Sequence, residues 1–174
     1  MKRTLWISLM AGAISATAGQ WSKPVEVRQD TALCVTYRAK LAGEYLLVEA
    51  KHEPGWHTNS MDNDKRAAEK LGGKKALGVD KPTQISGEGI EVTGPWLQSA
   101  PKDFSKPDLL WYTWGFDTQA QFVAKVKAPK AGQVTVRGQA CSEASCRNIE
   151  VTLDVPAGSA KEPAPDLKPL IAVR

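Results

Sequence analysis

Two cysteines separated by four residues are the part of this sequence best suited to chemistry. Cys141 and Cys146 lie in the polar stretch 138–148 (GQACSEASCRN). Two thiols at this spacing can form a disulfide with each other or exchange with the disulfide of another protein. Directly opposed residues of an antiparallel strand pair have Cα atoms roughly 4.5 to 5.5 Å apart, within or close to the range that a disulfide requires. A Cys141–Cys146 disulfide is therefore geometrically reasonable across a hairpin.

The segments on either side of the cysteines predict such a hairpin. Residues 133–137 (QVTVR) have the composition of a strand, and residues 149–155 (IEVTLDV) alternate strictly between apolar and polar side chains. This alternation has the period of a half-buried strand. Two such runs joined by a short polar connection indicate a β-hairpin with the cysteines near its turn.

The hairpin leaves two interpretations of the cysteine pair open. In the chain-entropy model, closing so short a loop stabilises the fold by about 2 kcal/mol, against about 4.7 kcal/mol for a loop of a hundred residues. The pair is therefore poorly placed as a structural disulfide. Strained or exposed disulfides are the ones that exchange, and a cross-strand disulfide is easily strained. Spacing alone does not separate a structural disulfide from a redox-active one.

The beginning of the chain predicts export. Lys2 and Arg3 form a short positive region, residues 5–16 are mostly apolar, and 16–18 (ATA) fit the cleavage pattern of a secretory signal peptide. We expect a signal peptide at 1–18, a mature chain beginning at Gly19, and an exported protein. The apolar run is too short for a transmembrane helix, and no later run is long enough, so the chain is not expected to span a membrane.

Charge and length narrow the classes of function. Cleavage after residue 18 removes two of the 23 basic residues, leaving 21 against 19 acidic ones and a net charge of +2. Since no basic cluster stands out, the sequence predicts no nucleic-acid partner. Residues 19–174 have the length of one domain with a core of its own.

A third cysteine, Cys34, is left over from any pairing of Cys141 with Cys146. In an exported chain an odd count leaves one free thiol. The favoured interpretation is a partly buried, unpaired thiol in a strand. Exchange with Cys141 or Cys146 is the alternative.

Most of the chain predicts short strands with Gly and Pro turns. One short helix is expected at 64–71, begun by Asp62 or Asn63 and ended by Gly72–Gly73, in a solvated surface excursion at 65–81. From Pro156 onward no periodicity remains, so 157–174 is expected to be a flexible tail and 19–156 the domain. The pattern predicts an all-β, immunoglobulin-like antiparallel β-sandwich with one short helix in a loop. The expected strands or apolar runs are 24–28, 33–41, 45–51, 82–86, 90–93, 109–116 and 120–128.

The two histidines suggest a metal site only weakly. His52 and His57 flank a Pro-Gly turn, with Met61 nearby, but no cysteine is close in sequence. We interpret both histidines as polar loop residues around a packed Trp56, and we predict no metal and no cofactor.

An aromatic group at 111–114 has two interpretations. Trp111, Tyr112 and Trp114 have the composition of a platform for binding sugars. Aromatic side chains on both faces of one strand are more often part of a core. We therefore expect these residues in the core.

Three motifs together resemble the N-terminal periplasmic domain of DsbD thiol:disulfide interchange proteins. Residues 139–146 (QACSEASC), followed by an alternating strand that ends at 155–156 (VP), resemble the active-site hairpin of that domain. Residues 52–57 (HEPGWH) are similar to its Pro-Gly-Trp/Tyr-His turn, and 81–85 (KPTQI) to its Pro-Thr strand. The resemblance covers about 24–156. It implies an immunoglobulin-like domain that takes electrons from a membrane-embedded partner and reduces disulfides in exported thioredoxin-fold proteins.

The resemblance also implies a cap loop. In the family, an aromatic side chain of this loop covers the cysteines until a partner arrives. Asp103 and Phe104, in the polar loop 98–108, fall at the matching place. Phe104 is therefore implied to be the cap; the alternative is a hydrophobic anchor that only pins the loop.

The resemblance assigns the sulfurs as well. Cys146 is implied to bond to partners and Cys141 to resolve the mixed disulfide. Arg147 would favour the Cys146 thiolate and Glu143 would oppose it, unless solvent screens both charges. The family commonly has prolines after the second cysteine, where this chain has Arg147 and Asn148.

The electron source follows from where the chain ends. DsbD continues into a membrane domain and a thioredoxin domain, whereas this chain ends at Arg174. The resemblance therefore implies a membrane thiol reductase on a separate chain. The competing hypothesis is a non-enzymatic exported binding module in which the Cys141–Cys146 disulfide is static.

Overall fold

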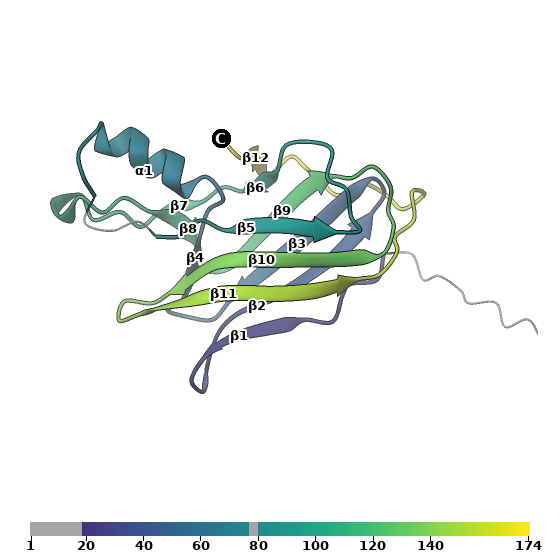
Figure 1. Ribbon diagram of the computed structural model, residues 1–174, viewed down its shortest axis with the longest axis horizontal. Coiled ribbons are helices and arrows are strands. Elements are labelled where there is room, and N and C mark those ends of the chain that lie inside the picture. Colours follow the sequence, from purple (N-terminus) through teal and green to yellow (C-terminus); the bar gives the residue numbers. More distant parts are fainter. Residues whose placement is uncertain (1–18, 77–79) are drawn as a thin grey trace, which may run out of the picture.

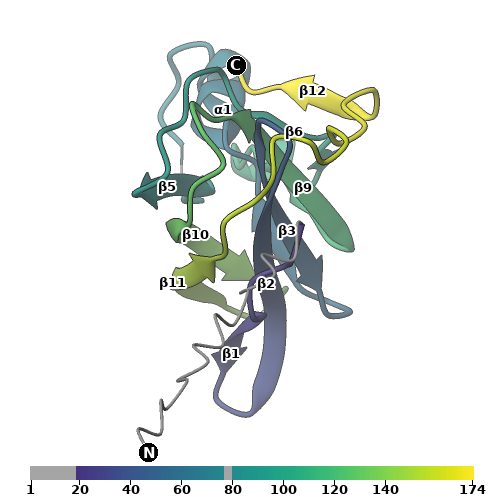
Figure 2. The same ribbon diagram turned by 90° about the vertical axis from the view of Figure 1, so that its right-hand side faces the viewer.

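Two antiparallel β-sheets pack face to face in the computed structural model, which describes residues 19–76 and 80–174 (Figures 1 and 2). The first sheet has the order β1 (Val25–Gln29), β2 (Ala32–Ala42), β3 (Tyr45–His52), β9 (Gln119–Lys125), β6 (Leu97–Ser99) and β12 (Leu170–Ala172). The second has the order β11 (Cys146–Val155), β10 (Gly132–Cys141), β4 (His57–Asn59), β8 (Trp114–Phe116) and β7 (Lys102–Asp103), and β5 (Gln84–Glu88) also pairs with β10. The immunoglobulin-like sandwich predicted from the sequence is confirmed.

Residues 1–18, where the signal peptide is predicted, lie outside the described residues. Within 19–76 and 80–174, no helix has both the length and the apolar character needed to cross a membrane.

The core lies between the two sheets and is built from their alternating strands. Tyr37 and Leu41 of β2 and Phe122 of β9 are buried against Val134 and Val136 of β10. Burying one large apolar side chain contributes about 1.5 to 3 kcal/mol. Because many such side chains hold the sheets together, the loops at each end of the sandwich start from fixed positions.

The β10–β11 hairpin is longer than the alternating pattern predicted. Its register is continuous from Gly132 opposite Val155 to Cys141 opposite Cys146, so both strands reach the cysteines themselves. The cysteine end of the hairpin lies at the same end of the sandwich as β4, β7 and β8, on the left in Figure 1. The fold therefore places β4, β7 and β8, which are distant from the hairpin in sequence, at the end of the sandwich that carries the cysteine pair (Figure 1).

The α-helix found within the described residues confirms the sequence prediction closely. α1 (Asn63–Leu71) begins after Asp62 and ends at Gly72, whose φ of 56° is in the left-handed region. Glycine reaches this conformation without steric cost, and the Gly72 N–H donates to the Ala68 carbonyl at 3.2 Å.

Two apolar runs form less strand than expected. The run 90–93 makes only a single bridge, from Val92 to Val126. The run 109–116 is divided between a 3-10 turn, η1 (Pro107–Leu109), and β8. Leu110, with a φ of 50°, separates them, because a left-handed residue cannot continue a strand.

The last part of the chain contains a strand that the sequence pattern did not predict. Residues 157–174 were expected to be a flexible tail, yet β12 pairs with β6 from Leu170 opposite Ser99 to Ala172 opposite Leu97. Leu167 and Leu170 pack on a small apolar cluster that includes Leu47 and Val123. A three-residue strand is too short to show periodicity, which is why the pattern missed it.

Candidate redox site

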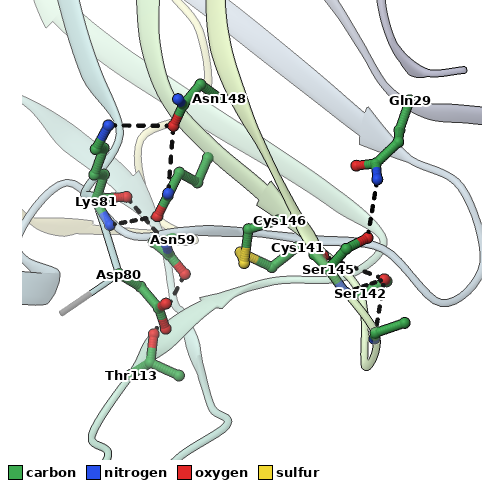
Figure 3. The surroundings of a disulfide bond; sticks show 12 residues. Gln29, Asn59, Asp80, Lys81, Thr113, Cys141, Ser142, Ser145, Cys146 and Asn148 are labelled. Carbon is green, nitrogen blue, oxygen red and sulfur yellow. Dashed lines mark hydrogen bonds between the residues drawn. A yellow bond between two sulfur atoms is a disulfide. The ribbon is translucent and has the colours of Figure 1, made fainter. Parts of the chain in front are cut away.

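Cys141 and Cys146 form a disulfide across the end of the β10–β11 hairpin, with their Cα atoms 4.0 Å apart (Figure 3). Cys141 also pairs with His57 of β4, so its strand is flanked on both sides. Cys141 is only 3% exposed, whereas Cys146 is exposed. Of the two sulfur-bearing residues, Cys146 is therefore the one that a second protein can reach.

The loop between the cysteines is held by its own serines. The Ser142 N–H and hydroxyl donate to the Ser145 carbonyl at 2.8 and 3.2 Å, and the Ser142 hydroxyl oxygen accepts from the Ala144 and Ser145 N–H groups. Gln29, at the end of β1, donates from Nε2 to the Ser145 hydroxyl at 3.1 Å. These contacts, drawn in Figure 3, fix the turn relative to the first sheet.

A pocket of about 560 Å³ adjoins the disulfide. It brings both cysteines together with Phe104 from the predicted cap loop, and with polar and aromatic side chains from four other segments. Its lining comprises Gly55, Trp56, His57, Asp80, Phe104, Lys106, Trp111, Thr113, Asp117 and residues 141–146.

Of the two residues assigned to the cap loop, the pocket contains Phe104 but not Asp103. The half-buried Phe104 ring stacks on His57, with ring centroids 4.8 Å apart and an interplanar angle of 22°. Its N–H donates to the Thr113 carbonyl at 2.9 Å. Asp103 is exposed at the end of β7, where its carboxylate accepts from the Ser105 N–H at 2.9 Å.

His52 is a buried residue at the end of β3, not the polar loop residue expected from the sequence. Its ring nitrogens contact the Thr58 hydroxyl at 2.8 Å and the Thr118 carbonyl at 3.0 Å. Burial lowers the pKa of His52 to about 4, and burial also lowers the pKa of His57. Both rings are therefore neutral at pH 7.

Neither histidine lies in a close cluster of three or more His, Cys, Asp or Glu side chains in the part of the chain that the structure describes. The cluster found there is Asp80 with Cys141 and Cys146: a carboxylate oxygen and the two disulfide sulfurs all lie within 4.8 Å of one another.

Asp80 and Trp111 are the site residues that sequence reasoning missed. Asp80 was expected in a solvated excursion, but it is only 7% exposed and lies beside the disulfide. Trp111 was expected in the core, but it is half-buried in the pocket wall, where its Nε1–H donates to Asp80 Oδ2 at 2.8 Å. The one signal for Asp80 was its position directly before the Pro-Thr motif at 81–85.

Glu143 and Arg147 are the charged residues nearest to the cysteines in sequence, and only Glu143 lines the pocket. Glu143 is exposed and lines the pocket. Arg147 is exposed, lies opposite Ala140 in the hairpin and is not part of the pocket lining.

Cys34 is a free thiol in β2, as predicted, but it is fully buried rather than partly buried. Burial raises the pKa of Cys34, and a backbone hydrogen bond at Gln29 and the charge of Arg147 lower it by smaller amounts. A buried thiol with a raised pKa is a poor nucleophile. The disulfide in the structure joins the other two cysteines.

Two solved structures share this fold. The N-terminal periplasmic domain of ScsB from Proteus mirabilis is 18% identical with a TM-score of 0.55; the match covers 86% of this chain and 55% of that one. The N-terminal domain of Neisseria meningitidis DsbD in the reduced form is 8% identical with a TM-score of 0.52, covering 81% of this chain and 91% of that one. This chain thus spans about half the length of the ScsB chain. No family model and no curated protein matches the sequence.

Proposed function

We propose that this chain is an exported, periplasmic thiol:disulfide exchange module. It passes electrons from a membrane thiol reductase to thioredoxin-fold proteins through Cys141 and Cys146. The observation that supports this most is the placement of a disulfide with one exposed partner, Cys146, at the end of a sandwich whose fold is that of the DsbD and ScsB N-terminal periplasmic domains.

The exchange reaction uses the two sulfurs in sequence. In the reduced chain, the Cys146 thiolate attacks one sulfur of the partner disulfide, which forms a mixed disulfide and releases the other partner sulfur as a thiolate. Cys141 then attacks Cys146 Sγ and releases the second partner sulfur. Two electrons have moved to the partner, the two protons of the dithiol end on the partner thiols, and the Cys141–Cys146 disulfide is restored. The membrane reductase then reduces it again.

Capture of a partner tests this function. A Cys141→Ala chain retains the exposed sulfur but lacks the resolving one, so the mixed disulfide with an oxidised thioredoxin-fold protein should persist. A static disulfide in a binding module predicts no such product, so failure to capture would reject the proposal.

Phe104 is the cap of this site in the proposal. Its ring lies in the pocket that contains both cysteines and stacks on His57. An aromatic pair of this kind contributes about 0.5 to 1.5 kcal/mol, so Phe104→Ala should speed alkylation of reduced Cys146 about two- to tenfold. The measurement is the rate of iodoacetamide labelling of the peptide that contains Cys146.

Leu109→Ala is the matched control for the cap. Leu109 is a 48% exposed apolar residue of the same connection and does not line the pocket. Its removal should leave the labelling rate of Cys146 unchanged. If Phe104→Ala also leaves the rate unchanged, Phe104 only anchors the loop.

A further inference from the structure

A buried carboxylate lies beside the disulfide and has no part in the exchange steps described above. One carboxylate oxygen of Asp80 lies within 4.8 Å of both the Cys141 and the Cys146 sulfur, and Asp80 is only 7% exposed. Aspartate is almost never buried unless it is paired. The burial of Asp80 next to the Cys141–Cys146 disulfide therefore requires an explanation.

Asp80 is held in place from three sides. The Trp111 Nε1–H donates to its Oδ2 at 2.8 Å, and the Asn63 side-chain amide donates to its carbonyl at 3.1 Å. The next residue, Lys81, donates its N–H to the Gln139 side chain of β10 at 2.9 Å. The carboxylate is therefore fixed relative to the hairpin that carries the sulfurs.

The charge of Asp80 is not neutralised by an ion pair within residues 19–76 and 80–174. Lys81 Nζ instead contacts the Asn148 side chain at 3.2 Å. Lys81 does not line the pocket; the one lysine that does is the exposed Lys106, and His57 is neutral at pH 7. The remaining charged or titratable side chains at the pocket or beside the cysteines are Asp117, Glu143 and Arg147.

We propose that Asp80 is a positioning residue that keeps the Cys141 thiol protonated in the reduced chain at neutral pH. A carboxylate is ionised at this pH, and a like charge at short range opposes the formation of a thiolate. Cys141 is also 3% exposed, so water stabilises its thiolate poorly, whereas Cys146 is exposed. Asp80 opposes a thiolate at either sulfur, since both lie within 4.8 Å of its carboxylate, and the burial of Cys141 makes Cys146 the sulfur that ionises first.

This inference rests on the proposed exchange function and assigns the order of its steps. Cys146 attacks as the thiolate, while Cys141 remains a thiol during formation of the mixed disulfide. Cys141 loses its proton when it attacks Cys146 Sγ, and the departing partner thiolate takes up a proton in turn. The proton count of the exchange is unchanged; Asp80 delays the second step.

The test uses a Cys146→Ala chain and follows the pH dependence of iodoacetamide labelling at Cys141. Mass analysis of the Cys141 peptide excludes any contribution from Cys34. The labelling midpoint should lie above the usual thiol pKa of about 8.5. Adding Asp80→Asn should lower the midpoint by about 1 to 2 pH units, since it removes the charge and keeps an oxygen that accepts from Trp111. Asp80→Glu, which restores the charge, should restore the high midpoint.

Asp117→Asn is the control, because Asp117 lines the same pocket but is paired with Lys102 at 2.6 Å. It should leave the midpoint unchanged. A midpoint at or below about 8.5 in the Cys146→Ala chain would overturn the proposal without any change at Asp80. An equal effect of Asp80→Asn and Asp117→Asn, or no effect of Asp80→Asn, would overturn it as well.

The same data separate this inference from the exchange function. Labelling of the Cys146→Ala chain needs no partner protein, so its midpoint does not depend on the exchange function. A raised midpoint together with failed partner capture would reject the exchange function only. Capture together with an unmoved midpoint would reject the Asp80 proposal only.

Discussion

A reduced Cys141→Ala chain mixed with an oxidised thioredoxin-fold protein is expected to accumulate as a mixed disulfide through Cys146. The exposed Cys146 sulfur can attack, and without Cys141 no second sulfur of this chain can release the partner. The wild-type chain should show no lasting adduct, because Cys141 lies within bonding distance of Cys146. The adduct is measured on non-reducing gels and assigned by mass analysis of the linked peptides.

Two variants control this capture. Cys146→Ala leaves only the 3% exposed Cys141 at the site and should capture far less of the same partner. Cys34→Ala removes the buried thiol and, combined with Cys141→Ala, should capture as much as Cys141→Ala alone. Equal capture through Cys141 and Cys146 would contradict the assignment of Cys146 as the sulfur that bonds to partners.

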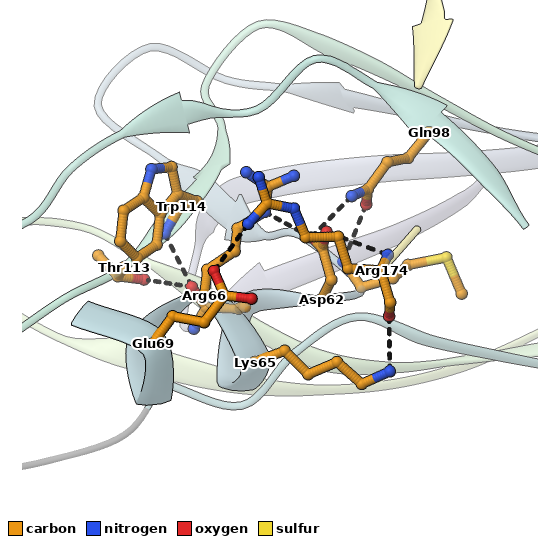
Figure 4. Close-up of polar contacts among 10 residues, drawn as sticks. Asp62, Lys65, Arg66, Glu69, Gln98, Thr113, Trp114 and Arg174 are labelled. Carbon is orange, nitrogen blue, oxygen red and sulfur yellow. Dashed lines mark hydrogen bonds and ion pairs between the residues drawn. The ribbon is translucent and has the colours of Figure 1, made fainter. Parts of the chain in front are cut away.

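Replacing Asp62 should cause the largest loss of stability among the polar residues at the α1 end of the sandwich (Figure 4). Its side chain is fully buried, and its Oδ1 accepts from Arg66 Nε at 2.9 Å and from Gln98 Nε2 at 2.8 Å. Its Oδ2 accepts from the Arg174 N–H at 3.3 Å, which ties the chain end to the helix. Since Asp62→Ala leaves a mostly buried arginine without its partner, we expect a loss of about 3 to 5 kcal/mol in the free energy of unfolding.

Urea denaturation measures this loss, and Glu26→Ala is the matched control. Glu26 pairs with Arg28 at 2.8 Å, but both side chains are about half exposed, and such surface pairs contribute at most about 1 kcal/mol. If Asp62→Ala lowered the free energy of unfolding by no more than Glu26→Ala does, this would contradict a structural role for the Asp62 cluster, which comprises Asp62 and its partners Arg66, Gln98 and Arg174.

The Asp62 cluster also predicts how stability depends on pH. Burial raises the pKa of Asp62, but the hydrogen bonds from Arg66 and Gln98 and the charge of Arg66 outweigh it, and the pKa falls from 3.8 to about 2. A carboxyl group with a lowered folded-state pKa stabilises the fold above its unfolded pKa and loses that contribution as pH falls. The wild-type chain should therefore lose stability between about pH 4 and 2, and Asp62→Asn should lose less over that interval.

The local parts of the fold could be predicted from the sequence. The alternation in β2 and β11 identifies the buried face of each strand, because successive side chains of a strand point to opposite faces. Gly72 marks the end of α1 for a reason that is also local, since glycine reaches the left-handed region without steric cost. The cysteine hairpin followed from the same kind of pattern, whereas Cys34 breaks the alternation of β2, because it is buried next to the buried Val35.

The contacts that complete the site could not be predicted from local pattern. Lys81 and Gln139, which hold Asp80 against the hairpin, are 58 positions apart in the sequence. The segment around Asp80 has few apolar residues, so its composition indicated a solvated loop, and its burial depends on Asn63, Trp111 and β10. The β12 strand depends in the same way on a distant partner, β6.

The cap assignment shows what the family resemblance could and could not supply. It assigned the consecutive residues Asp103 and Phe104 together. Consecutive residues of an extended chain point to opposite sides, so only one of the two side chains can face the disulfide. The structure places Phe104 in the pocket and leaves Asp103 exposed. Whether Phe104 controls access to Cys146 remains a prediction, which the labelling rates of Phe104→Ala and Leu109→Ala test.

The reduction potential of the Cys141–Cys146 pair tests the central claim most directly. The chain is equilibrated in a series of thiol:disulfide buffers, and the fraction of reduced Cys141 and Cys146 is counted by mass after alkylation. A redox-active pair predicts a potential above about −300 mV, where exported thioredoxin-fold proteins can exchange with it. A potential below about −300 mV would identify a structural disulfide and contradict the proposed electron transfer.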